Sequence, residues 1–150
     1  MRIYMVVMDE TAEAKRALRF AALRAARTGG AVHILALVPQ NNFNAFGGVQ
    51  ATIEQEAKDR AEVMANSEAG NIFAEHGKRP TIAVRTGDPL AAIKSYLEDH
   101  KDIAALVLGA SSENGAGPLV TYFTSGAARM PCPLYIVPGA LTTEQIDALA

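Results

Sequence analysis

The sequence is poor in cysteine and in long apolar runs, and each shortage excludes a class of protein. Cys132 is its only cysteine, so no internal disulfide can form, and a reducing compartment suits the chain. No stretch approaches the roughly 20 apolar residues that a membrane-spanning helix needs. The first apolar run ends at Asp9, too early for the core of a signal peptide. We therefore expect a cytoplasmic protein without a membrane partner.

The sequence also lacks an excess of charge of one sign. Its 14 Lys and Arg residues are balanced by 16 Asp and Glu residues, which leaves a formal net charge of −2. Nucleic-acid-binding proteins need clustered cations to displace counterions from phosphates, so we expect no nucleic-acid partner. With 49% hydrophobic and 20% charged residues, the composition is typical of one globular domain, which would span residues 1–150.

Several signatures of enzymes and metal sites are missing. The sequence has no G-x-G-x-x-G after its first apolar run, no Walker-type G-x-x-x-x-G-K-[ST] and no G-x-S-x-G. His33, His76 and His100 lack ligand spacing, so we expect no metal site. Cys132, between two prolines, is expected to be a small buried hydrophobe. Apart from Asp9, no residue is an evident general base, so an enzyme is the least favoured function.

The sequence does contain a regular alternation of strand-like and helix-like segments. Continuous apolar runs are typical of strands that are buried on both faces of a sheet. Five such segments occur, at residues 3–8, 31–38, 81–85, 103–108 and 134–137. Helical periodicity fills the intervals between them, so the pattern predicts an α/β fold with a parallel sheet and helices on both faces. Periodicity alone does not distinguish the two commonest strand orders.

Capping residues mark where some of these helices begin and end. Asp88 stands before Pro89 as an N-cap, and Thr142 and Gln145 have the spacing of a capping box. Pro118 is expected to open a short helix that ends near residue 130. The long helix after residue 50 is expected to stop at residue 77. Its predicted inner face carries Ile53, Ala57, Ala61, Met64, Ile72 and Phe73.

Two features are predicted to lie at the carboxyl edge of the sheet, where α/β folds bind ligands. Asp9 and Thr11 follow the first strand, and Gly109 begins the turn GASSENGAGPLVT after the fourth. Small residues in this turn would let the backbone approach a ligand, namely Ser111, Ser112, Gly115 and Gly117. Pro118 then opens a helix whose free N–H groups suit a phosphate. The same residues also suit a plain reversal of the chain.

Residues 39–50 show no periodicity and are predicted to form a loop at the same edge. Phe43 and Phe46, followed by Gly47 and Gly48, combine apolar side chains with a flexible backbone. This combination suits a lid or a contact with a partner. It equally suits a surface loop whose phenylalanines pack on their own domain.

Across nearly its whole length the sequence resembles the universal stress proteins. The matching stretches are VVMDET, HILALV, RTGDPLAAI, LVLGASS and PCPLYIVP, in that order along the chain. The resemblance implies a Rossmann-like, five-stranded parallel sheet in the order 3-2-1-4-5, and a homodimer paired through the fifth strand. It also implies ATP between the first and fourth strands, with Asp9 facing the nucleoside and Val38 beside the adenine. Gly109 and Thr121 would then meet the ribose or the phosphates.

The glycine pattern of ATP-binding members, G-x2-G-x9-G-[ST], is only partly present. Gly109 matches its first glycine, whereas Ser112 and Val120 stand at the other two glycine positions. The stretch from Gly109 to Val120 is also shorter by two residues, or up to ~7 Å of chain, so it follows a different path. Three functions therefore stay open: an ATP-binding stress protein, an interaction protein of the same family without nucleotide, and a slow ATP hydrolase.

Overall fold

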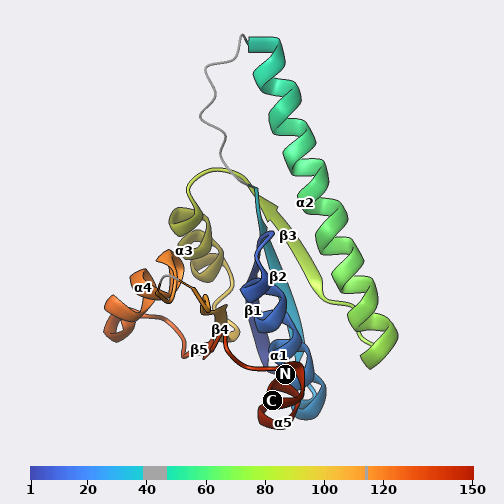
Figure 1. The fold of residues 1–150 in the computed structure, drawn as a ribbon, viewed down its shortest axis with the longest axis vertical. Coiled ribbons are helices and arrows are strands. Elements are labelled where there is room, and N and C mark those ends of the chain that lie inside the picture. The colour runs from blue at the N-terminus through green and yellow to red at the C-terminus, as the bar shows by residue number, and fades with distance from the viewer. Residues whose placement is uncertain (39–46, 114) are drawn as a thin grey trace.

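The fold is built on a five-stranded parallel sheet with the order β3-β2-β1-β4-β5, as the computed structural model shows (Figure 1). The structure describes residues 1–38, 47–113 and 115–150. Its strands are β1 (Ile3–Met8), β2 (Ala31–Leu37), β3 (Thr81–Arg85), β4 (Ile103–Gly109) and β5 (Leu134–Val137). This arrangement confirms the predicted α/β class and the strand order that the resemblance implied.

Helices cover both faces of the sheet, as predicted (Figure 1). The face that carries α1, α2 and α5 lies opposite the face that carries α3 and α4. The helices are α1 (Ala12–Thr28), α2 (Gly47–His76), α3 (Pro89–Asp99), α4 (Pro118–Ser125) and α5 (Thr143–Leu149), with a 3₁₀ turn at Ala127–Arg129. None of the described helices is both long and apolar enough to cross a membrane.

The central strand β1 explains why the apolar runs are continuous rather than alternating. All six of its residues are buried, because it pairs with β2 on one side and β4 on the other while helices cover both faces. Tyr4, Val6 and Met8 pack toward α1 and α2. The intervening residues pack toward α3 and α4. Each large side chain buried in this way contributes roughly 1.5–3 kcal/mol.

Local hydrogen bonds set the beginnings of three helices. The Ala91 N–H donates to Asp88 Oδ2 at 3.1 Å, which confirms the predicted N-cap of α3. Thr142 and Gln145 form both bonds of a capping box at the start of α5. At α1 the cap is Thr11, whose hydroxyl oxygen accepts from the Ala14 N–H at 3.3 Å.

Two helix boundaries differ from the prediction. Helix α4 ends at Ser125 instead of near residue 130, because Gly126 follows and the chain tightens into the 3₁₀ turn. Helix α2 begins at Gly47, so residues 47–50 belong to a helix and not to a loop. The rest of the predicted lid or contact loop, including Phe43 and Phe46, lies outside the described residues.

Helix α2 also buries a narrower face than expected. Its buried residues recur at intervals of three or four: Ala57, Ala61, Ala65, Ala69 and Ile72. Phe73 follows one position later, about 100° further round the helix, and is 53% exposed, so its assignment to the inner face was wrong. With 30 residues, α2 is about 45 Å long and extends past the carboxyl edge of the sheet (Figure 1).

A cluster of three rings lies beneath α3, near the amino edge of the sheet. His33 Nδ1 on β2 lies 2.8 Å from the Tyr96 hydroxyl on α3, and the His100 ring stacks on Tyr96 with centroids 3.9 Å apart. The His33 and His100 rings meet edge to face at 5.7 Å. Burial lowers the pKa of His33, and the charge of His100 lowers it further while Asp102 opposes the change.

This cluster predicts that acid destabilises the fold. The unfolded chain binds a proton at His33 near pH 6.5, whereas the lowered pKa keeps the folded form neutral to lower pH. The unfolded state therefore binds more protons, and the free energy of unfolding should decrease as the pH falls below about 6.5. Urea denaturation between pH 8 and pH 5 measures this decrease. The His33→Gln protein should show a smaller slope, whereas His76→Gln, outside the cluster, should keep it.

Candidate functional site

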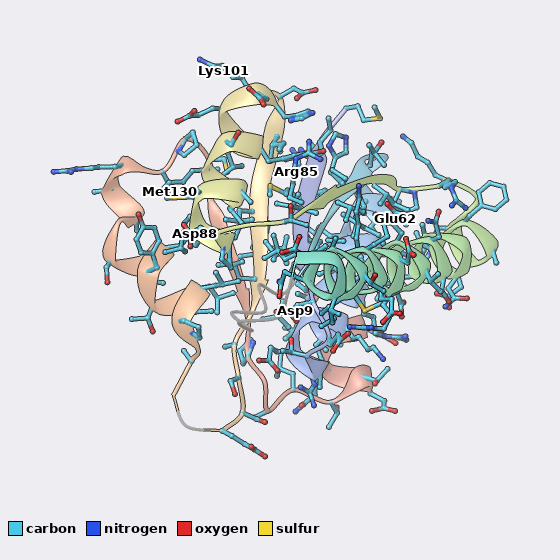
Figure 2. All side chains as sticks on the ribbon, turned by 90° about the horizontal axis from the view of Figure 1, so that it is seen from above. Asp9, Glu62, Arg85, Asp88, Lys101 and Met130 are labelled. Carbon is cyan, nitrogen blue, oxygen red and sulfur yellow. The ribbon has the colours of Figure 1, made fainter. Side chains whose placement is uncertain are left out.

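A cleft of about 160 Å³ opens at the carboxyl edge of the sheet, where β1 and β4 end side by side. The residues after β1, the end of β4 and the beginning of α4 form its walls. Figure 2 looks onto this edge and shows Asp9 close to the centre of the molecule. The strand order reverses between β1 and β4, because β2 and β3 lie on one side of β1 and β5 lies on the far side of β4. Such reversal points are where doubly wound folds bind ligands.

Asp9 is oriented by Thr11. Asp9 Oδ1 accepts a hydrogen bond from the Thr11 backbone N–H at 2.9 Å and another from the Thr11 hydroxyl. Since Thr11 itself caps α1, Asp9 supports the helix only through Thr11. Asp9 Oδ2 accepts no hydrogen bond from any residue that the structure describes, so this oxygen is available to a ligand in the cleft.

Gly109 has a structural reason to be glycine. A Cβ at this position would lie 2.0 Å from the Glu13 carbonyl oxygen and 2.5 Å from its carbon. Only the absence of a side chain lets the first turn of α1 approach the end of β4 this closely. Asp9 and Gly109 both line the cleft that this contact borders.

The turn after Gly109 closes on itself. The Ser111 hydroxyl donates to the Glu113 carbonyl oxygen at 2.9 Å and accepts from the Glu113 N–H at 3.1 Å. The Ser111 N–H donates to the Ala116 carbonyl at 3.1 Å. Gly115 and Gly117 have φ of 83° and 98°, the left-handed region that favours glycine, so they supply the reversal. Ser111, Ser112 and Gly115 therefore shape the turn and do not line the cleft.

Gly139, a residue that the sequence analysis did not single out, packs against the turn after Gly109. A Cβ at Gly139, just after β5, would lie 2.4 Å from the Ala110 carbonyl oxygen and 2.5 Å from the Ser112 nitrogen. The turn thus packs directly onto the backbone after β5. No local pattern identifies Gly139, because the atoms that require it belong to another part of the chain.

Two other predicted residues lie away from the cleft walls. Val38 is buried in the core beneath α1 and α2, and its N–H donates to the Arg85 carbonyl at 2.9 Å. The Thr121 hydroxyl donates to the Gly117 carbonyl at 2.9 Å within α4. Of the nine residues predicted for a nucleotide, four line the cleft, namely Asp9, Thr11, Gly109 and Gly117.

The cleft combines negative side chains with the positive end of a helix. Glu13, the second residue of α1, is a further acidic residue that lines the cleft. The opposite wall is the first turn of α4, whose leading N–H groups lack partners within the helix. Its dipole contributes about 0.3–1 kcal/mol toward an anion. This arrangement suits a ligand with hydroxyl or amino donors at one end and a single anionic group at the other.

The described residues offer little else for chemistry in the cleft. Within residues 1–38, 47–113 and 115–150, no group of three His, Cys, Asp or Glu side chains could hold a metal ion. Cys132 is half-buried behind β4, and burial raises the pKa of its thiol. A raised pKa keeps the thiol protonated and therefore unreactive.

Fold and cleft together define an α/β protein of the doubly wound class, with its candidate site at the reversal point of the sheet. The sequence model of the Universal stress protein family matches residues 1–138. The chain therefore belongs to the universal stress protein family, as its motifs indicated. A search of curated proteins found no match.

Solved structures share the fold at low sequence identity. The universal stress protein UspA from Lactobacillus plantarum has a TM-score of 0.78 and 18% identity, covering 91% of this chain and 97% of that one. A universal stress protein in complex with cAMP has a TM-score of 0.59 and 18% identity, covering 91% and 96%. The universal stress protein from Archaeoglobus fulgidus in complex with dAMP has a TM-score of 0.53 and 18% identity, covering 91% and 97%. Relatives of the same fold thus bind adenine nucleotides.

The contact between Gly109 and Glu13 predicts a strongly destabilised Gly109→Ala protein. The added Cβ must displace the backbone of α1, which should lower the free energy of unfolding by about 3 kcal/mol. Gly70→Ala is the control, because a Cβ there meets nothing within 4 Å and the position lies inside α2. That change should stabilise the protein by roughly 0.5–1 kcal/mol. Similar denaturation midpoints for both variants would contradict the role of Gly109.

Proposed function

We propose that this universal stress protein binds an adenine nucleotide in the cleft between β1 and β4, and acts in the cytoplasm as a homodimer. The observation that carries the proposal is the free carboxylate oxygen of Asp9, which shares the cleft with the N-terminus of α4. A carboxylate oxygen accepts from the hydroxyl or amino groups of a nucleoside, and a helix N-terminus receives a phosphate. The solved relatives bound to cAMP and dAMP support the proposal.

The proposal also concerns how many phosphates the bound nucleotide carries. ATP is the nucleotide that the motif resemblance implies, but the cleft has about 160 Å³ and is lined by the acidic residues Asp9 and Glu13. The shortened turn is also closed by the bond from the Ser111 N–H to the Ala116 carbonyl. Because repulsion from these acidic residues increases with each phosphate, we expect AMP to bind at least as tightly as ATP.

Titration calorimetry with AMP and with ATP tests this function. Asp9→Asn is the most informative variant, because its side-chain oxygen can still accept from Thr11 while Oδ2 becomes an amide donor. It should weaken nucleotide binding by about tenfold, or ~1.4 kcal/mol, and leave the melting temperature nearly unchanged. Glu113→Gln, in the turn outside the cleft walls, is the matched control and should bind like the parent protein.

The absence of heat with either nucleotide at about 1 mM would contradict the proposal, since it places any affinity below roughly 4 kcal/mol. Phosphate release is followed in the same samples. We expect no hydrolysis. If release does occur, its persistence at full rate in Asp9→Ala would show that Asp9 is not its general base.

A second candidate is a dimeric interaction protein that binds no nucleotide. The closed turn favours this second function, because the hydroxyl and the N–H of Ser111 already form hydrogen bonds with neighbouring backbone atoms. The edge strand β5 supplies a surface for the dimer. It pairs only with β4 in the described sheet, and its Ile136 is 37% exposed. An unpaired edge of this kind is a template for another strand.

A dimer through β5 predicts that Ile136→Glu dissociates it. Like charges from two copies would then meet across the interface, so the dimer dissociation constant should increase at least about tenfold. Sedimentation over a concentration series measures the constant. Val63→Glu is the control, because Val63 is 70% exposed on α2 at the other side of the sheet. An equal effect of both substitutions would exclude β5 as the interface.

A further inference from the structure

A second and larger hollow lies on the other flank of α4, between α4 and α3. Its volume is about 610 Å³, within the 300–1,000 Å³ of small-molecule sites. Its apolar lining comes from Leu97 on α3, Phe123 on α4, and Met130 with Pro131 on the segment that follows. Figure 2 shows Met130 beside both helices. We call this hollow the α3–α4 groove.

The groove exists because α4 is short. Gly126 ends the helix, and the Gly126 N–H donates to the Tyr122 carbonyl at 3.2 Å before the chain tightens into the 3₁₀ turn. The chain then passes Met130 and Pro131 on its way to β5 and forms the far wall of the groove. The concave shape therefore follows from the backbone path rather than from one flexible side chain.

Cations stand at the polar rim of this apolar surface. Lys94 Nζ donates to the Tyr122 hydroxyl and lies 4.7 Å from the centre of the Tyr122 ring, so two interactions hold the ammonium in place. Tyr122 is itself 38% exposed and is packed edge to face on Phe123 at 5.2 Å. The ammonium has further protons to donate to a ligand, since a lysine carries three.

Arg129 adds a second cation to the rim. Its side chain makes no ion pair or hydrogen bond with any residue that the structure describes. Glu98 is the one acid among the described lining residues, so two positive charges stand against one negative charge. The groove therefore has an apolar floor and a rim with an excess positive charge.

We propose that the α3–α4 groove binds an amphipathic carboxylate, a molecule with an apolar tail and one acidic group. The tail would lie on Tyr122, Met130 and Pro131, the apolar lining residues that are not fully buried, where it removes apolar surface from water. The carboxylate would accept charge-assisted hydrogen bonds from Lys94 and Arg129. A nucleotide does not suit this surface, because its polar base, sugar and phosphates would leave the apolar floor uncovered. The proposal does not rest on nucleotide binding in the cleft.

The test uses decanoate as the ligand and the full-length protein. Binding is followed through backbone amide chemical shifts, and it should be saturable at or below about 1 mM with the largest changes at Phe123 and Met130. Decanol, with the same tail but no charge, should bind at least about fivefold more weakly, and decyltrimethylammonium more weakly still. Lys94→Met and Arg129→Met each remove a charge but keep an apolar stem, and each should raise the dissociation constant about tenfold.

The control variant is Lys101→Met, which removes an exposed cation beyond the end of α3 and should bind decanoate like the parent protein. Thermal melting checks that each variant is folded. The proposal would be overturned by no saturable binding or by equal affinity for the cationic amphiphile. Displacement of decanoate by AMP would also overturn it, because it would place decanoate in the β1–β4 cleft. A weaker dimer in Lys94→Met, together with a dimer dissociation constant that decanoate does not change, would assign the groove to a second copy of the chain. That result would also overturn the proposal.

Discussion

The close approach of the Glu13 carbonyl to Gly109 is the contact on which the cleft depends. It packs the first turn of α1 against the end of β4, and β1, which leads into α1, pairs with β4 along the same line. The carboxyl ends of β1 and β4 therefore lie side by side. Asp9, oriented through Thr11, and the beginning of α4 line the same cleft. A side chain at residue 109 would push these walls apart.

Helix α4 is the element that the two hollows share. Its first turn forms one wall of the β1–β4 cleft, whereas its second half, with Tyr122 and Phe123, forms one wall of the α3–α4 groove. This helix has eight residues, of which Val120 and Phe123 are buried. Phe123, which is 2% exposed, is its main anchor in the core. The two hollows therefore have α4 as a common wall.

Predictions from the sequence were correct where the cause was local. Asp88 and the pair Thr142 and Gln145 cap their helices through hydrogen bonds that span three residues, so spacing alone identifies them. The predictions from the sequence failed where packing against other elements decided whether a residue is buried. Phe73 follows the helical period closely enough to suggest burial, yet it stays 53% exposed among the residues that the structure describes. The predicted binding role of Ser111 is untested, but its hydroxyl is occupied within its own turn.

The alternation of apolar and helical segments was enough to establish an α/β chain, and the motifs were enough to indicate its family, because both are properties of short stretches. The contact of Glu13 with Gly109 and the packing of Gly139 on Ser112 could come only from tertiary structure, since each joins backbone atoms from separate elements. The same holds for the α3–α4 groove. Its walls come from two helices and the segment before β5. The distances between these elements cannot be read from any single stretch of sequence.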